Sequence, residues 1–329
     1  MPALSEINQI GKREDLSDIL VVADAKNTPV TSMMKKGKKP VKTIFDWPVG
    51  SVPNPDTASV PDGAPVTSTE DLSGSRALLH NRVHKLRRAF GVSEFAEDVA
   101  DPAGVQSEFK HNKANALLAV KRGIEAVFCG DQDSSLSGTT HTCRGLGSWI
   151  SSSAQTDNPV PAAYRTPAGS IKSVALTSLL ESDILALMQS IYEQTGQMGD
   201  WDGIFGTALK ATVSSWTIHD PNVSNKTVVR TFQTQLKDNT LSGTIDIIKG
   251  DFGTIREHPT LWNAYNNSTK AADTKRGYVL DMDDLMMRVN KAPGFKPLPD
   301  DDSGPRGLIS AIVSDQMGSP LKHGKIVGS

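Results

Sequence analysis

Apolar residues at helical spacing identify one long helix in the first half of the chain. Within residues 102–129 they recur at helical spacing, at Phe109, Leu117, Val120, Ile124 and Val127/Phe128. The other face carries the basic residues Lys110, Lys113, Lys121 and Arg122. Pro102 near the start, Asp101 as the N-cap and Gly130 at the end define its limits. At 1.5 Å per residue, the pattern predicts a helix roughly 40 Å long.

Two extended segments precede this helix. Residues 42–49 are rich in β-branched and aromatic side chains, and residues 77–95 mix apolar and basic ones, so we predict a strand and a return strand. Residues 50–75 between them are a polar loop with four prolines. A connection of about 25 residues is far longer than the ~2–5 of a hairpin turn. Because an extended pair of strands is marginally stable alone, we expect it to lie on another molecule.

The remaining pattern mixes helices and strands, which makes the fold class α+β. Residues 1–34 form an arm, and residues 131–172 are irregular and rich in Ser, Thr, Gly and Pro. Ser178 and Glu181 have the spacing of a capping box and open a predicted helix. The predicted helices cover residues 179–194 and 207–216. The predicted strands cover residues 226–232, 244–249, 254–257, 278–281, 285–289 and 308–313, and residues 322–327 form the tail.

Composition adds that much of the chain consists of loops, arms or surface covered by something else. Only 37% of the 329 residues are apolar, below the ~45–50% usual for globular chains. A net charge of −2 argues against a protein that coats nucleic acid. Two cysteines rule out a disulfide scaffold. With neither a signal peptide nor a membrane span, we expect a soluble chain made in a reducing compartment.

The titratable residues do not form a catalytic or metal-binding motif. His80 and His84 have the spacing of a zinc-binding helix but lack the glutamate that follows the first histidine. Cys129, Cys143 and His141 are fewer than the four ligands of a structural zinc site. The acidic runs 281–284 and 300–302 lack EF-hand spacing and are typical of solvated turns. We therefore expect no enzyme activity, no cofactor and no metal.

Two basic stretches are candidate binding surfaces. Residues 35–42 and 82–88 could contact nucleic acid or the acidic patches of a neighbouring subunit. The second interpretation is favoured, since the net charge is near zero and no aromatic residues are interleaved to stack on bases.

The order of these segments resembles the HK97-type major capsid proteins of tailed phages, and more specifically the SU10-type family. An arm is followed by a long hairpin, a long helix, a helical middle region and a late β-rich region. The stretches that carry the resemblance are residues 27–34 (NTPVTSMM), 43–47 (TIFDW), 81–85 (NRVHK) leading into Val92-Ser93, 121–125 (KRGIE), 245–253 (IDIIKGDFG) and 278–281 (YVLD).

The resemblance implies an HK97-like capsid fold and divides the chain accordingly. It assigns residues 1–34 to an N-terminal arm, 35–95 to an extended E-loop hairpin, 96–175 to a P-domain with the spine helix at about 102–129, 176–275 to an A-domain, and 276–329 to a return into the P-domain and a tail. On the hairpin, Phe45 and Trp47 become candidate subunit contacts, because aromatic residues dominate interface energetics. Burial in their own domain is a nearly equal alternative.

The resemblance also implies a function and its partners. The expected protein is a structural major capsid protein that assembles as hexamers and pentamers into an icosahedral head around double-stranded DNA. Its expected partners are further copies of itself, a portal, a separate scaffolding protein, weakly and non-specifically contacted DNA, and possible decoration proteins. The scaffold is separate because the segment before the hairpin is too short to hold one. The expected location is the virion, after assembly in the bacterial host cytoplasm.

Two alternatives stay open at this stage. One is an encapsulin-like nanocompartment shell that binds an enzyme cargo, and the other is an α+β hydrolase with an unrecognised site. The long Pro-rich loop favours the virus over the nanocompartment, and the absence of a paired catalytic motif argues against the hydrolase.

Overall fold

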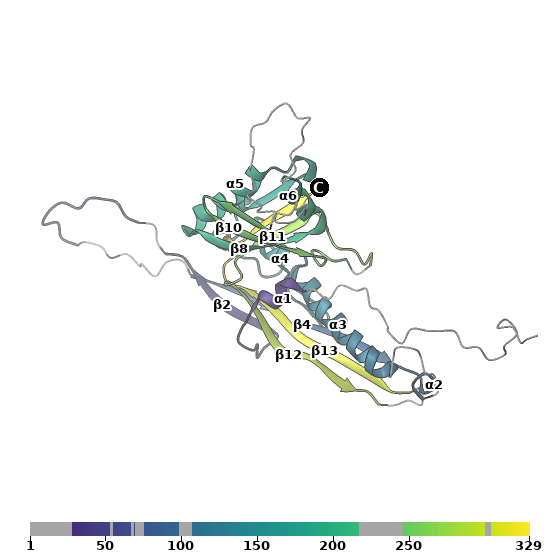
Figure 1. The fold of residues 1–329 in the computed structure, drawn as a ribbon. Helices are drawn as coiled ribbons and strands as arrows, with labels where there is room; N and C mark the ends of the chain where they lie inside the picture. Colours follow the sequence, from purple (N-terminus) through teal and green to yellow (C-terminus); the bar gives the residue numbers. More distant parts are fainter. Residues whose placement is uncertain are drawn as a thin grey trace, which may run out of the picture.

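The computed structural model describes residues 28–52, 55–66, 69, 76–98, 107–216, 246–266, 268–299 and 304–329. They form an elongated body, in which one long helix lies along a narrow sheet, and a more compact body around a second sheet (Figure 1). A two-stranded hairpin extends away from both (Figure 1). The mixture of helices and sheets confirms the predicted α+β class.

The elongated body is a four-stranded sheet covered on one face by α3 (Glu108–Phe128). The strand order is β1-β12-β13-β4, with β1 parallel to β12 and the other pairs antiparallel. Val120 and Ile124 of α3 share one hydrophobic cluster with Ile309 and Val313 of β13. The strands are β1 (Lys35–Lys36), β4 (His84–Gly91), β12 (Leu285–Pro297) and β13 (Arg306–Met317).

The long helix begins later than its apolar pattern predicts. Its N-cap is Ser107, whose hydroxyl accepts a hydrogen bond from the backbone N–H of Lys110 at 3.3 Å. The expected cap at Asp101 is therefore wrong, and Asp101 itself lies outside the described residues. Glu97 of the short helix α2 (Glu94–Asp98) accepts from the Phe109 N–H at 3.0 Å. Side chains that satisfy the orphan N–H groups of a helix start fix its first residue.

The predicted return strand over residues 77–95 is two strands in two different sheets. β3 (Arg76–Arg82) pairs with β2 (Ile44–Gly50) in the hairpin. After Val83 the chain changes sheet, and β4 pairs with β13. The single-strand expectation fails because the change of partner depends on β13, which lies more than 200 residues further along the chain.

The end of the N-terminal arm is docked onto the long helix. The short helix α1 (Pro29–Met33) packs with Val30 fully buried. The carboxylate of Glu125 on α3 accepts hydrogen bonds from the Val30 and Thr31 N–H groups, both at 2.8 Å. Burial raises the pKa of Glu125, whereas these bonds oppose that shift. The remainder of the predicted arm, residues 1–27, lies outside the described residues.

The compact body is a six-stranded sheet in the order β7-β14-β11-β8-β10-β9. Helices α5 (Glu181–Thr195) and α6 (Thr207–Ser215) pack against it and share its hydrophobic cluster. The expected Ser178–Glu181 capping box is wrong, because the Asp183 carboxylate accepts from the Leu180 N–H at 3.0 Å. The strands are β7 (Ile171–Val174), β8 (Gly199–Gly206), β9 (Ile247–Gly250), β10 (Gly253–Thr260), β11 (Arg276–Leu280) and β14 (Gly324–Gly328).

The predicted strands of the second half are mostly confirmed, although β10, β12 and β13 are longer than expected. The strand predicted at 226–232 lies outside the described residues. Residues 131–172, predicted to be irregular, instead contain elements and core residues such as the fully buried Trp149. The elements are β5 (Ser135–Ser137), β6 (Thr140–Thr142) and α4 (Leu146–Trp149). Single 3-10 turns cover Ala162–Tyr164, Ala168–Ser170, Leu176–Ser178 and Pro320–Lys322.

Candidate assembly surfaces

The two aromatic contact candidates lie on the face of the hairpin that packs against its own chain. Trp47 is only 6% exposed, and its ring centroid lies 5.6 Å from that of Trp149. Phe45 stacks on Trp47 at 5.6 Å, and the Arg288 guanidinium lies 5.6 Å from the Phe45 ring centroid. Contact of these rings with a neighbouring subunit stays a prediction. Their packing supports the alternative interpretation, in which they fix the hairpin to its own body.

This packing predicts that Trp47→Ala destabilises the isolated subunit. Removing a buried indole should lower the free energy of unfolding by about 3 kcal/mol, because it leaves a cavity against Trp149. Thermal unfolding of the purified subunit measures the effect, and Leu78→Ala on the opposite face is the matched control. If the Trp47→Ala subunit melts at the wild-type temperature but does not assemble, then Trp47 contacts a neighbouring subunit rather than its own core.

The outward face of the hairpin contains an exposed residue that sequence reasoning missed. Leu78 on β3 is 63% exposed and lies opposite Pro48 on β2. The sequence could have identified it, because Leu78 and Leu79 are adjacent in a strand and their side chains must point to opposite faces. Leu79 is buried, so Leu78 is the better candidate for a contact with another subunit.

A buried polar cluster holds the base of the hairpin. Asn81 on β3 donates from Nδ2 to the backbone oxygen of Asp315 at 2.9 Å and to its Oδ1 at 3.0 Å. Asp315 Oδ2 accepts from Trp149 Nε1 at 3.0 Å. Asn81 Oδ1 accepts from the N–H groups of Arg82 and Arg144 at 2.8 and 2.9 Å. One cluster thus joins the hairpin, β13 and the segment around α4.

A second set of charged contacts surrounds this cluster. Arg144 is buried, and its Nε donates to Asp133 Oδ1 at 2.7 Å while its guanidinium lies 4.5 Å from the Trp149 ring centroid. Arg82 donates from Nε to Asp157 at 2.9 Å, and this arginine holds the pKa of Asp157 below its usual value. Both bonds involve a charged donor and a charged acceptor, so they are stronger than neutral ones. These contacts therefore fix the position at which the hairpin joins the rest of the chain.

Burial dominates the ionisation of the groups in this cluster. It raises the pKa of Asp315 to about 7, against smaller opposing effects of its hydrogen bonds and of Arg144. Burial also raises the pKa of the Cys129 and Cys143 thiols, which are both free and fully buried. Thiols in this state are poor nucleophiles.

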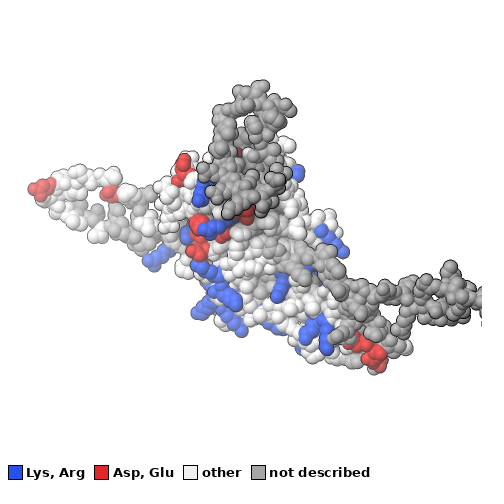
Figure 2. All heavy atoms as spheres, in the orientation of Figure 1, with Lys and Arg blue, Asp and Glu red and all other residues white. Residues whose placement is uncertain are grey.

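The loop at the end of the hairpin is acidic and apolar. Residues 51–75 contain Asp56, Asp62, Glu70 and Asp71 but no lysine or arginine. Three of its valines, Val52, Val60 and Val66, are between 74% and 90% exposed. Figure 2 shows Asp and Glu side chains at the far end of this loop. These exposed apolar side chains make the loop a candidate contact surface.

The four-stranded sheet has the opposite charge. Lysines and arginines number two in β1, three in β4, three in β12 and one in β13. The one acidic residue of these four strands is the buried Asp315. Figure 2 shows Lys and Arg side chains gathered along this elongated body. Part of the charge is paired within the chain, since Lys35 Nζ lies 2.7 Å from Asp283.

The part of the chain that the structure describes contains neither a cluster of metal-ligating residues nor a membrane-spanning helix. His80 lies 3.9 Å from Asp46 in the hairpin, whereas His84 belongs to β4. Across the described ranges, no three His, Cys, Asp or Glu side chains gather into a metal site. None of the described helices is long and apolar enough to cross a bilayer.

Solved structures of capsids match this fold over nearly the whole chain. A subunit titled "Cyanophage A-1(L) capsid asymmetric unit" matches with a TM-score of 0.65 and 11% identity, over 98% of this chain and 99% of that one. A subunit of Mycobacterium phage Bobi matches with a TM-score of 0.59 and 13% identity, over 97% and 96%. A third, titled "Capsid of native GTA particle computed with C5 symmetry", gives 0.60 and 10% identity over 97% and 96%.

These likenesses define the class of fold, that of HK97-type capsid proteins. The model of the SU10 major capsid protein family matches residues 4–329, and the chain therefore belongs to that family. Its role is structural, as a major capsid protein located in the virion. A comparison with curated proteins gave no match. Neither the hydrolase nor the nanocompartment alternative is favoured by these findings.

Proposed function

We propose that copies of this chain assemble as hexamers and pentamers into an icosahedral head that encloses double-stranded DNA, without catalysis. The observation that carries the proposal is the hairpin, which extends from a fixed base and ends in an acidic loop with exposed valines. The four-stranded sheet of the same chain is basic. A surface on one copy that complements a different surface on the next generates rings when the rotation closes.

The structure suggests how the hairpin contacts the next subunit. The loop of one copy lies across the basic sheet of its neighbour, where Asp56 and Asp62 approach Lys85 and Arg87 of β4 and the basic residues of β12. The valines of the loop bury apolar area that the isolated chain leaves exposed. In this arrangement residues 44–82, within the expected 35–95, form the E-loop, and α3 is the spine helix of a P-domain. The six-stranded sheet is the core of an A-domain that includes β7, β11 and β14 in addition to strands of the expected 176–275.

The further partners follow from the same assignment. We propose a portal and a separate scaffolding protein as assembly partners, decoration proteins as optional ones, and assembly in the bacterial host cytoplasm. Contact with packaged DNA is weak and non-specific. A chain with a net charge of −2 releases few counterions on binding, so its affinity for a duplex is low.

Expression in bacteria tests the proposal. The chain is produced with and without the candidate scaffolding protein encoded beside it, and both lysates are examined by electron microscopy. The expected result is closed shells of uniform diameter in the presence of the scaffold. Small species alone, under varied salt and pH, contradict the proposal.

A further inference from the structure

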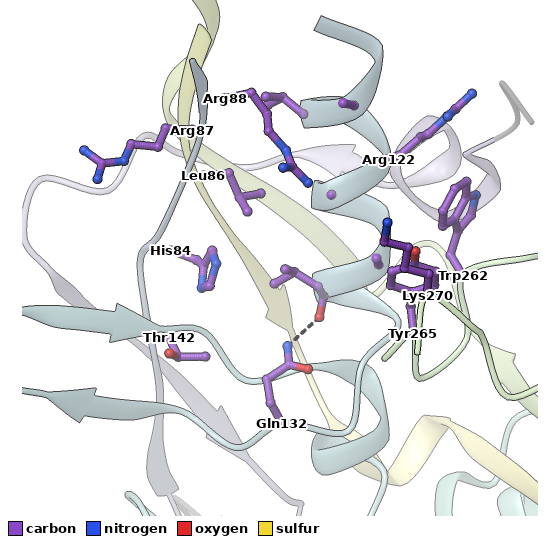
Figure 3. A pocket seen from close by; sticks show the side chains of 15 residues that line it. His84, Leu86, Arg87, Arg88, Arg122, Gln132, Thr142, Trp262, Tyr265 and Lys270 are labelled. Carbon is purple, nitrogen blue, oxygen red and sulfur yellow. Dashed lines mark hydrogen bonds between the residues drawn. The ribbon is translucent and has the colours of Figure 1, made fainter. Parts of the chain in front are cut away.

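A basic cavity beside α3 has not been used by the function described so far. It has a volume of about 620 Å³ and lies between β4, the middle of α3 and the segment after β10 (Figure 3). Arg88, Arg122 and Lys270 line it, together with the rings of Trp262 and Tyr265, whose centroids are 5.7 Å apart. Of the described residues that line this basic cavity, none is Asp or Glu. Its ligand should therefore be anionic.

Small residues of α3 form the floor of the basic cavity. Ala119, Gly123 and Ala126 line it, and a Cβ added at Gly123 would meet Leu86 Cδ2 at 3.8 Å, an ordinary van der Waals contact, so the small residues leave room above the helix without a clash. Arg88 points toward α3, whereas Arg87 points away from it (Figure 3). The cavity is therefore deep enough to take a side chain and has positive charge at its walls.

The far end of the elongated body carries the complementary chemistry. On α2, Phe95 is 80% exposed, and Glu94 and Asp98 on either side of it are also exposed. We call these three residues the acidic tip, and Asp and Glu side chains are visible at this end in Figure 2. An exposed phenylalanine between carboxylates fits a pocket with aromatic and cationic walls.

The acidic tip cannot reach the basic cavity of its own chain. Glu97 of α2 accepts from Ser107 Oγ at 2.6 Å, which fixes α2 at the start of α3. The cavity begins at Ala119, about 18 Å further along the helix at 1.5 Å per residue. Any contact between the two features must therefore join two copies.

We propose that the acidic tip of one copy enters the basic cavity of a second copy, with Phe95 against Trp262 and Tyr265 and the carboxylates facing Arg88 and Lys270. This inference rests on the proposed self-assembly and adds a second contact to that of the hairpin. The hairpin loop fits the cavity less well, since residues 51–75 include no aromatic residue. A duplex carries its phosphates on a convex surface, which fits a recess poorly.

A charge-swap experiment on the full chain tests the inference. Arg88→Glu/Lys270→Glu makes the charge of the cavity negative, and Glu94→Lys/Asp98→Lys makes the charge of the tip positive. All four residues are exposed. Each pair alone should lower the yield of closed shells at least about tenfold, the equivalent of 1.4 kcal/mol. The two pairs combined in one chain should restore most of it. Lys249→Glu/Lys275→Glu, at two exposed lysines that neither line the cavity nor belong to the tip, is the matched control and should assemble normally.

Each other outcome has a defined meaning. A combined variant that assembles no better than its parents overturns the inference, provided that all subunits melt as wild type. Rescue of the cavity variant by Asp56→Lys/Asp62→Lys would assign the cavity to the hairpin loop, and normal shells with less packaged DNA would assign it to phosphates. Either of these two outcomes would also overturn the inference that the acidic tip enters the cavity. If wild-type subunits form no shells, the proposed function fails instead, so the two failures are distinguishable.

Discussion

A subunit whose hairpin loop is replaced by a two-residue turn should fold but form no closed shells. The variant replaces residues 51–75 by Asn-Gly, and the geometry allows it because Gly50 and Arg76 are paired directly across the two strands. The inner face of the hairpin keeps Trp47 and Leu79 in the core. The melting temperature should therefore stay close to that of wild type, while the apolar and acidic contacts with a neighbour are lost.

Electron microscopy and sedimentation of the co-expressed protein measure this loss. The yield of closed shells should fall at least about tenfold, since each 1.4 kcal/mol of lost association energy is a factor of ten. Asp56→Asn/Asp62→Asn, which keeps the loop length, is the control for charge. This variant should weaken assembly less than the short-loop variant does, and its assembly should depend less on salt than that of wild type. Shells formed by the short-loop variant at wild-type yield would show that the loop is not an assembly contact.

The second large effect is a pH dependence that originates in Asp315. Its pKa in the folded chain is about 7 and its ordinary value is 3.8, so the folded state keeps a proton that the unfolded state releases. Between these two values, the free energy of unfolding falls as the pH rises. Three pH units correspond to about 4 kcal/mol at 1.36 kcal/mol per unit. The contribution of Asp315 to the free energy of unfolding is therefore greatest below pH 4. It decreases as the pH rises to about 7, and above that pH it no longer changes.

Comparison with Asp315→Asn isolates this effect from other titrating groups. Burial lowers the pKa of His84, which favours stability at higher pH, and raises the pKa of Glu125, which adds to the slope of Asp315. Both groups are present in wild type and variant alike, so they cancel in the difference. Urea unfolding of the two proteins from pH 4 to 8 should show a difference that changes across this window. A pH-independent difference would mean that Asp315 is already ionised in the folded subunit.

The sequence determined the elements whose apolar pattern is local. The 3.6-residue repeat of residues 109–128 predicted α3, and the same repeat predicted α5 and α6. The order of segments was enough to indicate the capsid family, because the long loop between two predicted strands is unusual. Trp47 was selected as a candidate subunit contact, with burial in its own domain as the alternative, and its ring packs on Trp149 in a region that the pattern left as irregular.

Only the tertiary structure decided the features that depend on partners distant in the chain. The split of residues 76–91 into two sheets follows from β13, and the cap at Ser107 follows from its position beside Glu97. The basic cavity joins β4, α3 and the segment around Trp262, and no local pattern links these three. The low apolar fraction of the chain indicated that some surface is covered by other molecules, and the exposed valines of the hairpin loop and Phe95 are the surfaces that we propose for such contacts. Hydrophobic spacing is encoded along the chain, whereas pairing and charge complementarity arise only when separate segments meet.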